Sequence, residues 1–234
     1  MSLDFERRAI QYSLWNLLPE QVWLNDPLRI VYAERKLTQM LVANQLGFSI
    51  PDTHITNNWQ YLDTLDYQKI VFKSSYGRLY AGNEQRMHFT QVYDKEGLPR
   101  QCNPFPGFWQ PYKHKNREWR ITVVGSKSFD AIITTDESAK DDWRYHQFSS
   151  KVRFERGEFP EVFKKKCYQY LERFGLRYGA FDFIEDSEGS IFFLECNANG
   201  QYAWLERELD LPISVAIADE LEHIASKGGT HVYG

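Results

Sequence analysis

Apolar residues recur at two different spacings along the chain, and each spacing predicts a different secondary structure. Four segments repeat apolar residues every three or four positions and are predicted to be helices: 10–18, 37–44, 163–174 and 212–225. Gly47 and Gly175 follow two of these segments, at the position where a left-handed residue ends many helices. The two glycines therefore set the expected ends of the second and third helices.

Other segments alternate apolar with polar residues or form short apolar runs, as β-strands do. They are 48–56, 70–72, 87–93, 119–123, 129–134, 180–184 and 191–197. A tight turn at 125–127 predicts one antiparallel hairpin, and the last two segments predict a second. Helices and hairpins come in blocks, which favours an α+β fold over a doubly wound sheet. One compact unit or two small lobes in contact would fit the length of 234 residues.

The composition indicates a folded chain. With 42% hydrophobic and 16% aromatic residues, and 28 basic against 32 acidic side chains, disorder is excluded. Because there is no apolar run of about 18 residues and no secretion signal, we expect no membrane association and a cytoplasmic location. Cys102, Cys167 and Cys196 lack the paired spacing of zinc or dithiol sites. A net charge of -4 gives no general attraction to phosphate backbones, so no nucleic-acid partner is expected.

The second hairpin carries the most informative polar residues. Asp182 and Glu195 are equidistant from the predicted turn centre between 188 and 189, which would place them opposite each other, with Asn197 on the face of Glu195. Two bare carboxylates about 5 Å apart repel by roughly 3 kcal/mol at an effective dielectric constant near 20. We therefore expect that only a bound divalent cation makes this pair tolerable. In the alternative, the register is off by one and both acids are solvated.

The three oxygen donors suit Mg²⁺ or Mn²⁺, and Mg²⁺ usually completes its shell with water and substrate phosphates. Basic residues elsewhere are candidates to meet such phosphates. Lys36 lies in the second predicted helix, and Lys73 ends an apolar strand before the small residues 74–77, although a solvated surface lysine is the alternative. Glu118 and Arg120 share a strand face that either lines a cleft, where they meet ribose and phosphate, or faces solvent.

Several ordered motifs are similar to those of a known family. They are Trp109-Gln110-Pro111-Tyr112, Glu118-Trp119-Arg120 through Val124-Gly125, Asp142-Trp143-Arg144, and Glu195-Cys196-Asn197-Ala198-Asn199-Gly200. Between Val31 and Ala218 the chain resembles the ATP-grasp ligases. Its motifs are most similar to those of the microviridin-type peptide maturases, also called graspetide synthetases. The chain also resembles the RimK-like glutamate ligases.

The resemblance implies a fold of two small α+β lobes whose antiparallel sheets clasp a nucleotide. On this basis we expect an N-terminal helical segment (1–30), a small lobe (31–110), and a large lobe with the metal site (111–234). Such ligases usually carry a leading α/β domain before the position of Lys36. Because only about 35 residues precede it here, we expect that domain to be absent from this chain.

The resemblance also implies a role for each matching residue. Arg120, Lys73 and Arg144 are the expected catalytic residues, and Asp142 with Arg144 is expected to bind the peptide substrate. The remaining roles follow by position: Lys36 and Lys73 for the ATP phosphates, Gln110 and Tyr112 for adenine, Glu118 for ribose, Arg120 for the transferring phosphate, and Asp182, Glu195 and Asn197 for Mg²⁺.

The implied activity is an ATP-dependent ligation through an acyl phosphate, which forms side-chain ester or amide links in an acidic ribosomal precursor peptide. The polar segments 74–83 and 135–147 are expected to act as lids that keep water from this intermediate. One alternative is a RimK-like enzyme that adds amino acids to a protein. Another is an inactive nucleotide-binding or peptide-binding module. A homodimer is left open.

Overall fold

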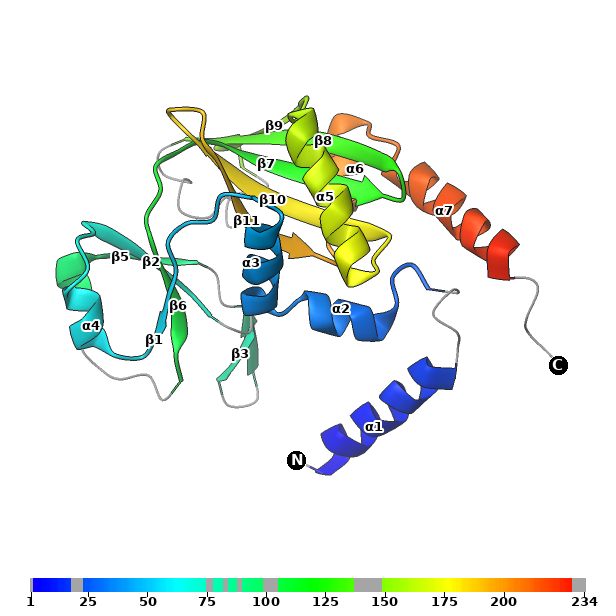
Figure 1. The fold of residues 1–234 in the computed structure, drawn as a ribbon, viewed down its shortest axis with the longest axis horizontal. Coiled ribbons are helices and arrows are strands. Elements are labelled where there is room, and N and C mark those ends of the chain that lie inside the picture. Colours follow the sequence, from blue (N-terminus) through cyan, green and yellow to red (C-terminus); the bar gives the residue numbers. More distant parts are fainter. Residues whose placement is uncertain are drawn as a thin grey trace.

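The computed structural model describes residues 2–17, 23–74, 78–81, 84–87, 90–98, 105–136 and 149–228 (Figure 1). The helices are α1 (Ser2–Leu17), α2 (Pro27–Ala33), α3 (Lys36–Gln45), α4 (Trp59–Asp63), α5 (Glu161–Phe174), α6 (Ala203–Leu209) and α7 (Ile213–Gly228), with a 3-10 turn at Lys95–Gly97. The strands are β1 (His54–Thr56), β2 (Lys69–Lys73), β3 (Arg78–Ala81), β4 (Glu84–Met87), β5 (Gln91–Asp94), β6 (Gly107–Pro111), β7 (Lys115–Val124), β8 (Lys127–Thr135), β9 (Val152–Arg156), β10 (Tyr178–Asp186) and β11 (Ile191–Asn197).

The larger sheet is antiparallel, with the strand order β11-β10-β7-β8-β9. Both predicted hairpins lie in it: β7 with β8, and β10 with β11. Gly175 ends α5 with a φ of 65°, as predicted from the sequence. The α+β fold is confirmed.

The two faces of this sheet have different neighbours. One face carries Trp119, Ile121 and Phe181 and packs in the main core, to which α3 and α5 also contribute (Figure 1). Val124 and Tyr178 lie on the other face, in a second cluster with Leu205 of α6 and Ile213 of α7. Because α6 and α7 pack near this end of β7, the polar residues further along the same face are left for the site described below.

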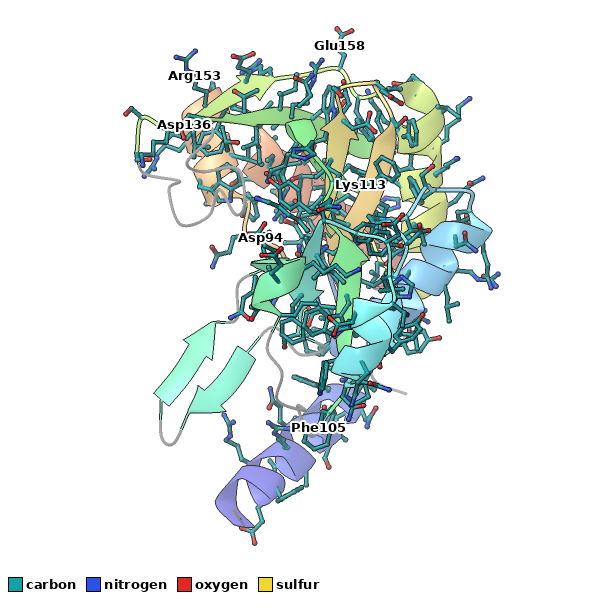
Figure 2. The ribbon with its side chains drawn as sticks, turned by 90° about the vertical axis from the view of Figure 1, so that its left-hand side faces the viewer. Asp94, Phe105, Lys113, Asp136, Arg153 and Glu158 are labelled. Carbon is teal, nitrogen blue, oxygen red and sulfur yellow. The ribbon has the colours of Figure 1, made fainter. Side chains whose placement is uncertain are left out.

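The smaller sheet has the strand order β1-β6-β2-β5. One of its faces packs Ile70 and Trp109 against Leu62 of α4. Phe108 and Gln110 alternate with these residues and lie on the opposite face. Figure 2 shows Lys113, in the connection between β6 and β7, between the two sheets. In the same view Glu158 lies at the top edge, and Phe105 lies in the lower part, near α1 in the projection.

Some elements differ from the sequence prediction. The extended segment 48–56 is not one strand, because Ser49 makes an isolated bridge to Phe192 and only 54–56 pairs with β6. The predicted strand 87–93 is divided between β4 and β5. The sequence analysis also missed α2, although Asp26 caps it through the backbone N–H groups of Leu28 and Arg29 and Pro27 opens it.

The predicted boundaries at 30 and 110 stay a prediction. Ala33, Ala43 and Phe48, which the sequence analysis gave to the small lobe, pack in the main core under the larger sheet. In the part of the chain that the structure covers, each helix is too short or too polar to span a lipid bilayer.

Candidate functional site

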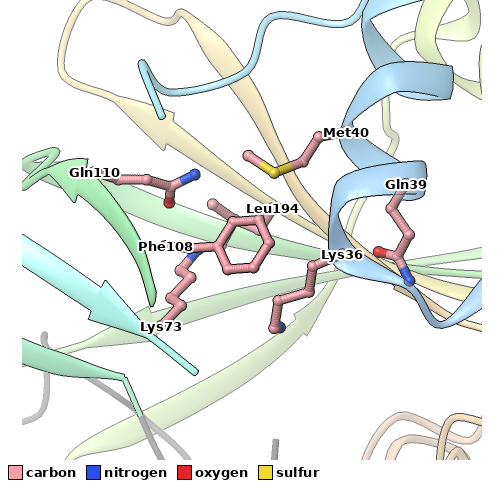
Figure 3. Close-up of a pocket in the computed structure, with 7 residues that line it drawn as sticks. All are labelled: Lys36, Gln39, Met40, Lys73, Phe108, Gln110 and Leu194. Atoms are coloured by element: carbon pink, nitrogen blue, oxygen red, sulfur yellow. The ribbon is translucent and has the colours of Figure 1, made fainter. Parts of the chain in front are cut away.

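A small pocket lies where α3, the smaller sheet and β11 meet (Figure 3). Its lining consists of Lys36, Gln39 and Met40 from α3, Lys73 from β2, Phe108 and Gln110 from β6, and Leu194 from β11. Three of the residues predicted to bind a nucleotide are therefore brought together. Cationic, amide and apolar side chains in one lining suit a ligand with a charged end and a planar, less polar part.

Three oxygen-bearing side chains lie together on the larger sheet. Asp182 pairs with Glu195 across β10 and β11, so the predicted register is confirmed. The Nδ2 of Asn197 donates to Asp182 Oδ2 and to Glu195 Oε1, each at 3.3 Å. Lys36, which lines the pocket, reaches the same Glu195, so the acidic cluster and the pocket form one site.

Each carboxylate of this cluster already has a cationic partner. Arg120 Nη1 donates to Asp182 Oδ1 at 2.8 Å and to Oδ2 at 2.9 Å. Lys36 Nζ lies 3.2 Å from Glu195 Oε2. The expectation that only a divalent cation makes the acid pair tolerable is therefore wrong, because two basic side chains from distant segments balance the charges.

Arg120 is the most deeply buried charge of the cluster, at 7% exposure. Burial alone would lower its pKa, but the charge of Asp182 and their hydrogen bond outweigh this effect, so the pKa of Arg120 is raised. Its Nη2 donates to the carbonyl of Gln201 at 3.3 Å. Its Nε is buried and has no hydrogen-bond partner within the described residues. A buried N–H of this kind is a ready donor to an anionic oxygen.

Comparisons with known proteins identify the family. No family model and no curated protein matches the sequence. A RiPP-associated ATP-grasp ligase from Chryseobacterium gregarium, solved with ADP and a leader and core peptide, is 28% identical with a TM-score of 0.80, and the match covers 93% of this chain and 68% of that one. The macrocyclase MdnC from Microcystis aeruginosa, bound with the precursor peptide MdnA, is 30% identical with a TM-score of 0.77 over 95% of this chain and 71% of that one. The chain belongs to the RiPP-associated ATP-grasp ligases.

A ligase that is not RiPP-associated by its name has a similar fold. A D-alanine–D-alanine ligase from Bacillus anthracis is 18% identical with a TM-score of 0.55, over 83% of this chain and 66% of that one. At this identity the likeness concerns the fold alone. The resemblance of the sequence motifs to those of ATP-grasp peptide maturases is confirmed by the matches at 28% and 30% identity.

Two further predicted residues of this ATP-grasp ligase, Glu118 and Tyr112, do not line the pocket. Glu118 accepts a hydrogen bond from Lys115 Nζ at 2.5 Å, and both side chains are nearly buried. The backbone N–H of Tyr112 donates to the carbonyl of Lys69 at 3.0 Å. The proposed roles of these two residues with ribose and adenine stay predictions.

The predicted peptide-binding residues Asp142 and Arg144 lie outside the described residues. Most of the two predicted lids does as well, because the described part includes only 74 and 78–81 of the first and 135–136 of the second. Their proposed roles therefore rest on the resemblance alone.

The sequence analysis missed Gln39, which lies one helical turn after Lys36. Its Nε2 donates to the carbonyls of Ala33 and Cys196, each at 2.8 Å, and its Oε1 accepts from the N–H of Cys196 at 3.0 Å. Cys196 lies between Glu195 and Asn197, so Gln39 fixes the backbone from which both side chains project. A polar residue on the buried side of a helix was the available signal.

We expect Gln39→Leu to lower the free energy of unfolding by about 3 kcal/mol, because it leaves buried backbone groups at Cys196 and Ala33 without a partner. Urea denaturation measures the change. The control is Gln45→Leu on the exposed side of the same helix, which should change little. Equal stability of the two variants would contradict the clamping role of Gln39.

The cysteines of the described segments are not candidate nucleophiles. Cys167 and Cys196 are buried, and burial raises the pKa of both thiols. They therefore remain protonated at neutral pH, which agrees with a core role. Within the ranges covered by the structure, no three side chains of His, Cys, Asp or Glu lie close enough together to hold a metal ion.

Proposed function

We propose that this chain is an ATP- and Mg²⁺-dependent ligase that joins side chains of a ribosomally made precursor peptide. The observation that carries the proposal is the convergence of Asp182, Glu195 and Asn197 with Lys36 and Arg120 at one site. Oxygen donors that suit a hard divalent ion, next to cations that suit phosphate, are the combination that phosphoryl transfer requires.

ATP fits the pocket in its chemistry. Met40, Phe108 and Leu194 offer apolar surface for a purine ring, and Lys36 with Lys73 offers positive charge for the phosphates. Arg120, which pairs with Asp182, adds a positive charge at the acidic end of the site. The related ligase from Chryseobacterium gregarium was solved with ADP, which supports a nucleotide ligand for this chain.

A magnesium ion would be held by Asp182, Glu195 and Asn197. Two carboxylates and one amide give only oxygen ligands, which suits Mg²⁺ and equally Mn²⁺. When bound, the ion supplies charge neutralisation at the phosphate oxygens. A complex of the related ligase PsnB contains Mg and ADP.

The reaction needs no nucleophile from the protein, in agreement with the buried, protonated thiols. A carboxylate oxygen of the peptide attacks the γ-phosphorus of ATP, the bond to the β-phosphate oxygen breaks, and ADP leaves. Lys73 and Arg120 neutralise the charge that develops on the transferred group. A hydroxyl or amine of the same peptide then attacks the acyl phosphate, loses its proton to solvent, and releases phosphate.

The substrate class follows from the family and the sequence motifs. Two related ligases were solved with a leader and core peptide and with a precursor peptide, respectively. We propose an acidic precursor peptide here, with Arg144 pairing with an acceptor carboxylate. A homodimer stays a prediction.

The test is incubation of the protein with ATP, Mg²⁺ and an acidic precursor peptide. We expect ADP release and a loss of one water per link, measured by mass spectrometry. If free glutamate is also supplied and becomes covalently attached, so that the mass of the substrate rises, the RimK-like activity would be favoured instead. Nucleotide binding without any product would favour the inactive module. The observation that favours this alternative is the ion pair of Asp182 with Arg120, which neutralises the carboxylate without a metal ion.

A further inference from the structure

The amide of Gln110 is held from one side by a residue outside the pocket lining. Gln110 is 5% exposed, lines the pocket, and donates from Nε2 to Thr53 Oγ1 at 2.9 Å. β1 and β6 are antiparallel, and His54 pairs with Trp109. The same register, continued by one residue, places Thr53 opposite Gln110. The two side chains are thus cross-strand neighbours on the face of the smaller sheet that carries Phe108.

The direction of this hydrogen bond is fixed by the next partner. The Thr53 hydroxyl donates to the carbonyl of Pro51 at 2.7 Å. A carbonyl oxygen can only accept, so the single hydroxyl proton of Thr53 is committed to Pro51. The Thr53 oxygen can then only accept from Gln110. The Gln110 amide must therefore direct its NH₂ group toward Thr53 and its Oε1 away from Thr53. The two hydrogen bonds fix this orientation, whichever way the oxygen and nitrogen of the amide are assigned.

An acceptor held in this way selects among purine bases. Gln110 lies beside Phe108 and Leu194 in the pocket, where the proposed function places the base (Figure 3). Adenine carries an amino group at its six position and can donate to Oε1. Guanine and hypoxanthine carry a carbonyl there, which would face Oε1 acceptor to acceptor. Such a site disfavours the wrong base because buried polar groups on both sides are left unpaired.

We infer that Thr53 is a specificity-determining residue that acts through Gln110: the chain from Pro51 to Thr53 to Gln110 sets the nucleotide site for adenine over six-oxo purines. This inference rests on the proposed nucleotide-binding function. Thr53 itself is a positioning residue, because it contacts Gln110 and not the pocket.

The experiment compares the binding of Mg²⁺-ATP and Mg²⁺-ITP by calorimetric titration, without peptide. ITP differs from ATP only in carrying the six-oxo group and its ring proton. We expect the unmodified protein to prefer ATP by about tenfold or more, the effect of one hydrogen bond exchanged for an acceptor pair. Thr53→Val keeps the shape but not the hydroxyl, so Gln110 can turn either way, and the preference should fall to within about threefold.

Thr53→Ser is the matched control, because it keeps the hydroxyl and should keep the preference. A Thr53→Val protein that retains the full preference for ATP, or a Thr53→Ser protein that loses it, overturns the inference while nucleotide binding stands. If the unmodified protein binds neither nucleotide, the proposed function itself fails. Should Thr53→Val not fold, Gln110→Met carries the test: it should also lose the preference, and its retention overturns the inference.

Discussion

Glu195→Gln should lower the rate of peptide ligation by at least about a hundredfold, the effect expected when a catalytic metal ion loses an anionic ligand. The substitution keeps the shape of the side chain but removes its charge and replaces one of its two acceptor oxygens with an NH₂ donor. Glu195 pairs with Lys36 in a partly buried environment in which the two side chains keep 24% and 25% exposure, so the fold should tolerate the change. The rate of ADP release with a saturating precursor peptide measures the effect.

The control for this variant is Glu185→Gln on the same hairpin. Glu185 also forms an ion pair, with Arg117 at 3.2 Å, and accepts from Trp119 Nε1 at 2.7 Å. Neither of these partners lines the pocket, whereas Lys36, the partner of Glu195, does. The rate of Glu185→Gln should stay within a few-fold of the unmodified protein. If Glu195→Gln retained full activity across a range of Mg²⁺ concentrations, Glu195 would not be a metal ligand.

The register that places Asp182 opposite Glu195 shows how far the sequence reaches. Symmetry about a turn centred between 188 and 189 predicts the right pair, although the turn closes from Asp186 to Ser190 and is centred on 188. With that turn alone, Asp182 would face Leu194. The register shifts by one between Asp182 and Phe183, because Leu194 is an extra residue on β11. No local sequence pattern predicts this β-bulge. The predicted pair of Asp182 and Glu195 was therefore right, although the bulge that produces it was not predicted.

Long-range contacts account for what the sequence could not show. The side chains of Lys36 and Glu195 come from positions 159 residues apart, so their ion pair has no local signature. In the sequence, the apolar lining residues Met40, Phe108 and Leu194 cannot be distinguished from ordinary core residues. They line a pocket only because the two sheets and α3 meet there. The periodic elements and the hairpins, by contrast, follow from local spacing and were predicted.

The two carboxylates of the site are neutralised by basic side chains and not, as first expected, only by a metal ion. Without a metal, Asp182 is neutralised by Arg120 and Glu195 by Lys36. A bound magnesium nucleotide would bring both signs of charge, so the acids and the bases can exchange partners without leaving an isolated charge. The site is therefore stable in both situations, and the strength of the Arg120 pair decides how readily an ion can compete for Asp182.

Arg120→Met should therefore make the protein depend on magnesium for its stability. The variant leaves Asp182 beside Glu195 without the guanidinium, and removal of one partner of a buried ion pair lowers the free energy of unfolding by about 3–5 kcal/mol. Mg²⁺ should restore a large part of this loss, because the ion takes the place of the lost cation. In the unmodified protein the same ion has to compete with Arg120, so its effect should be smaller.

Urea denaturation with and without Mg²⁺, in the absence of nucleotide, measures this difference. Arg117→Met is the matched control, since Arg117 lies on the same strand and pairs with Glu185 away from the pocket. Its stability should change by less than about 1 kcal/mol and should not respond to Mg²⁺ more than that of the unmodified protein. An equal magnesium response in Arg120→Met and Arg117→Met would mean that Asp182 does not bind the ion, and the assignment of the metal site to this hairpin would have to be abandoned.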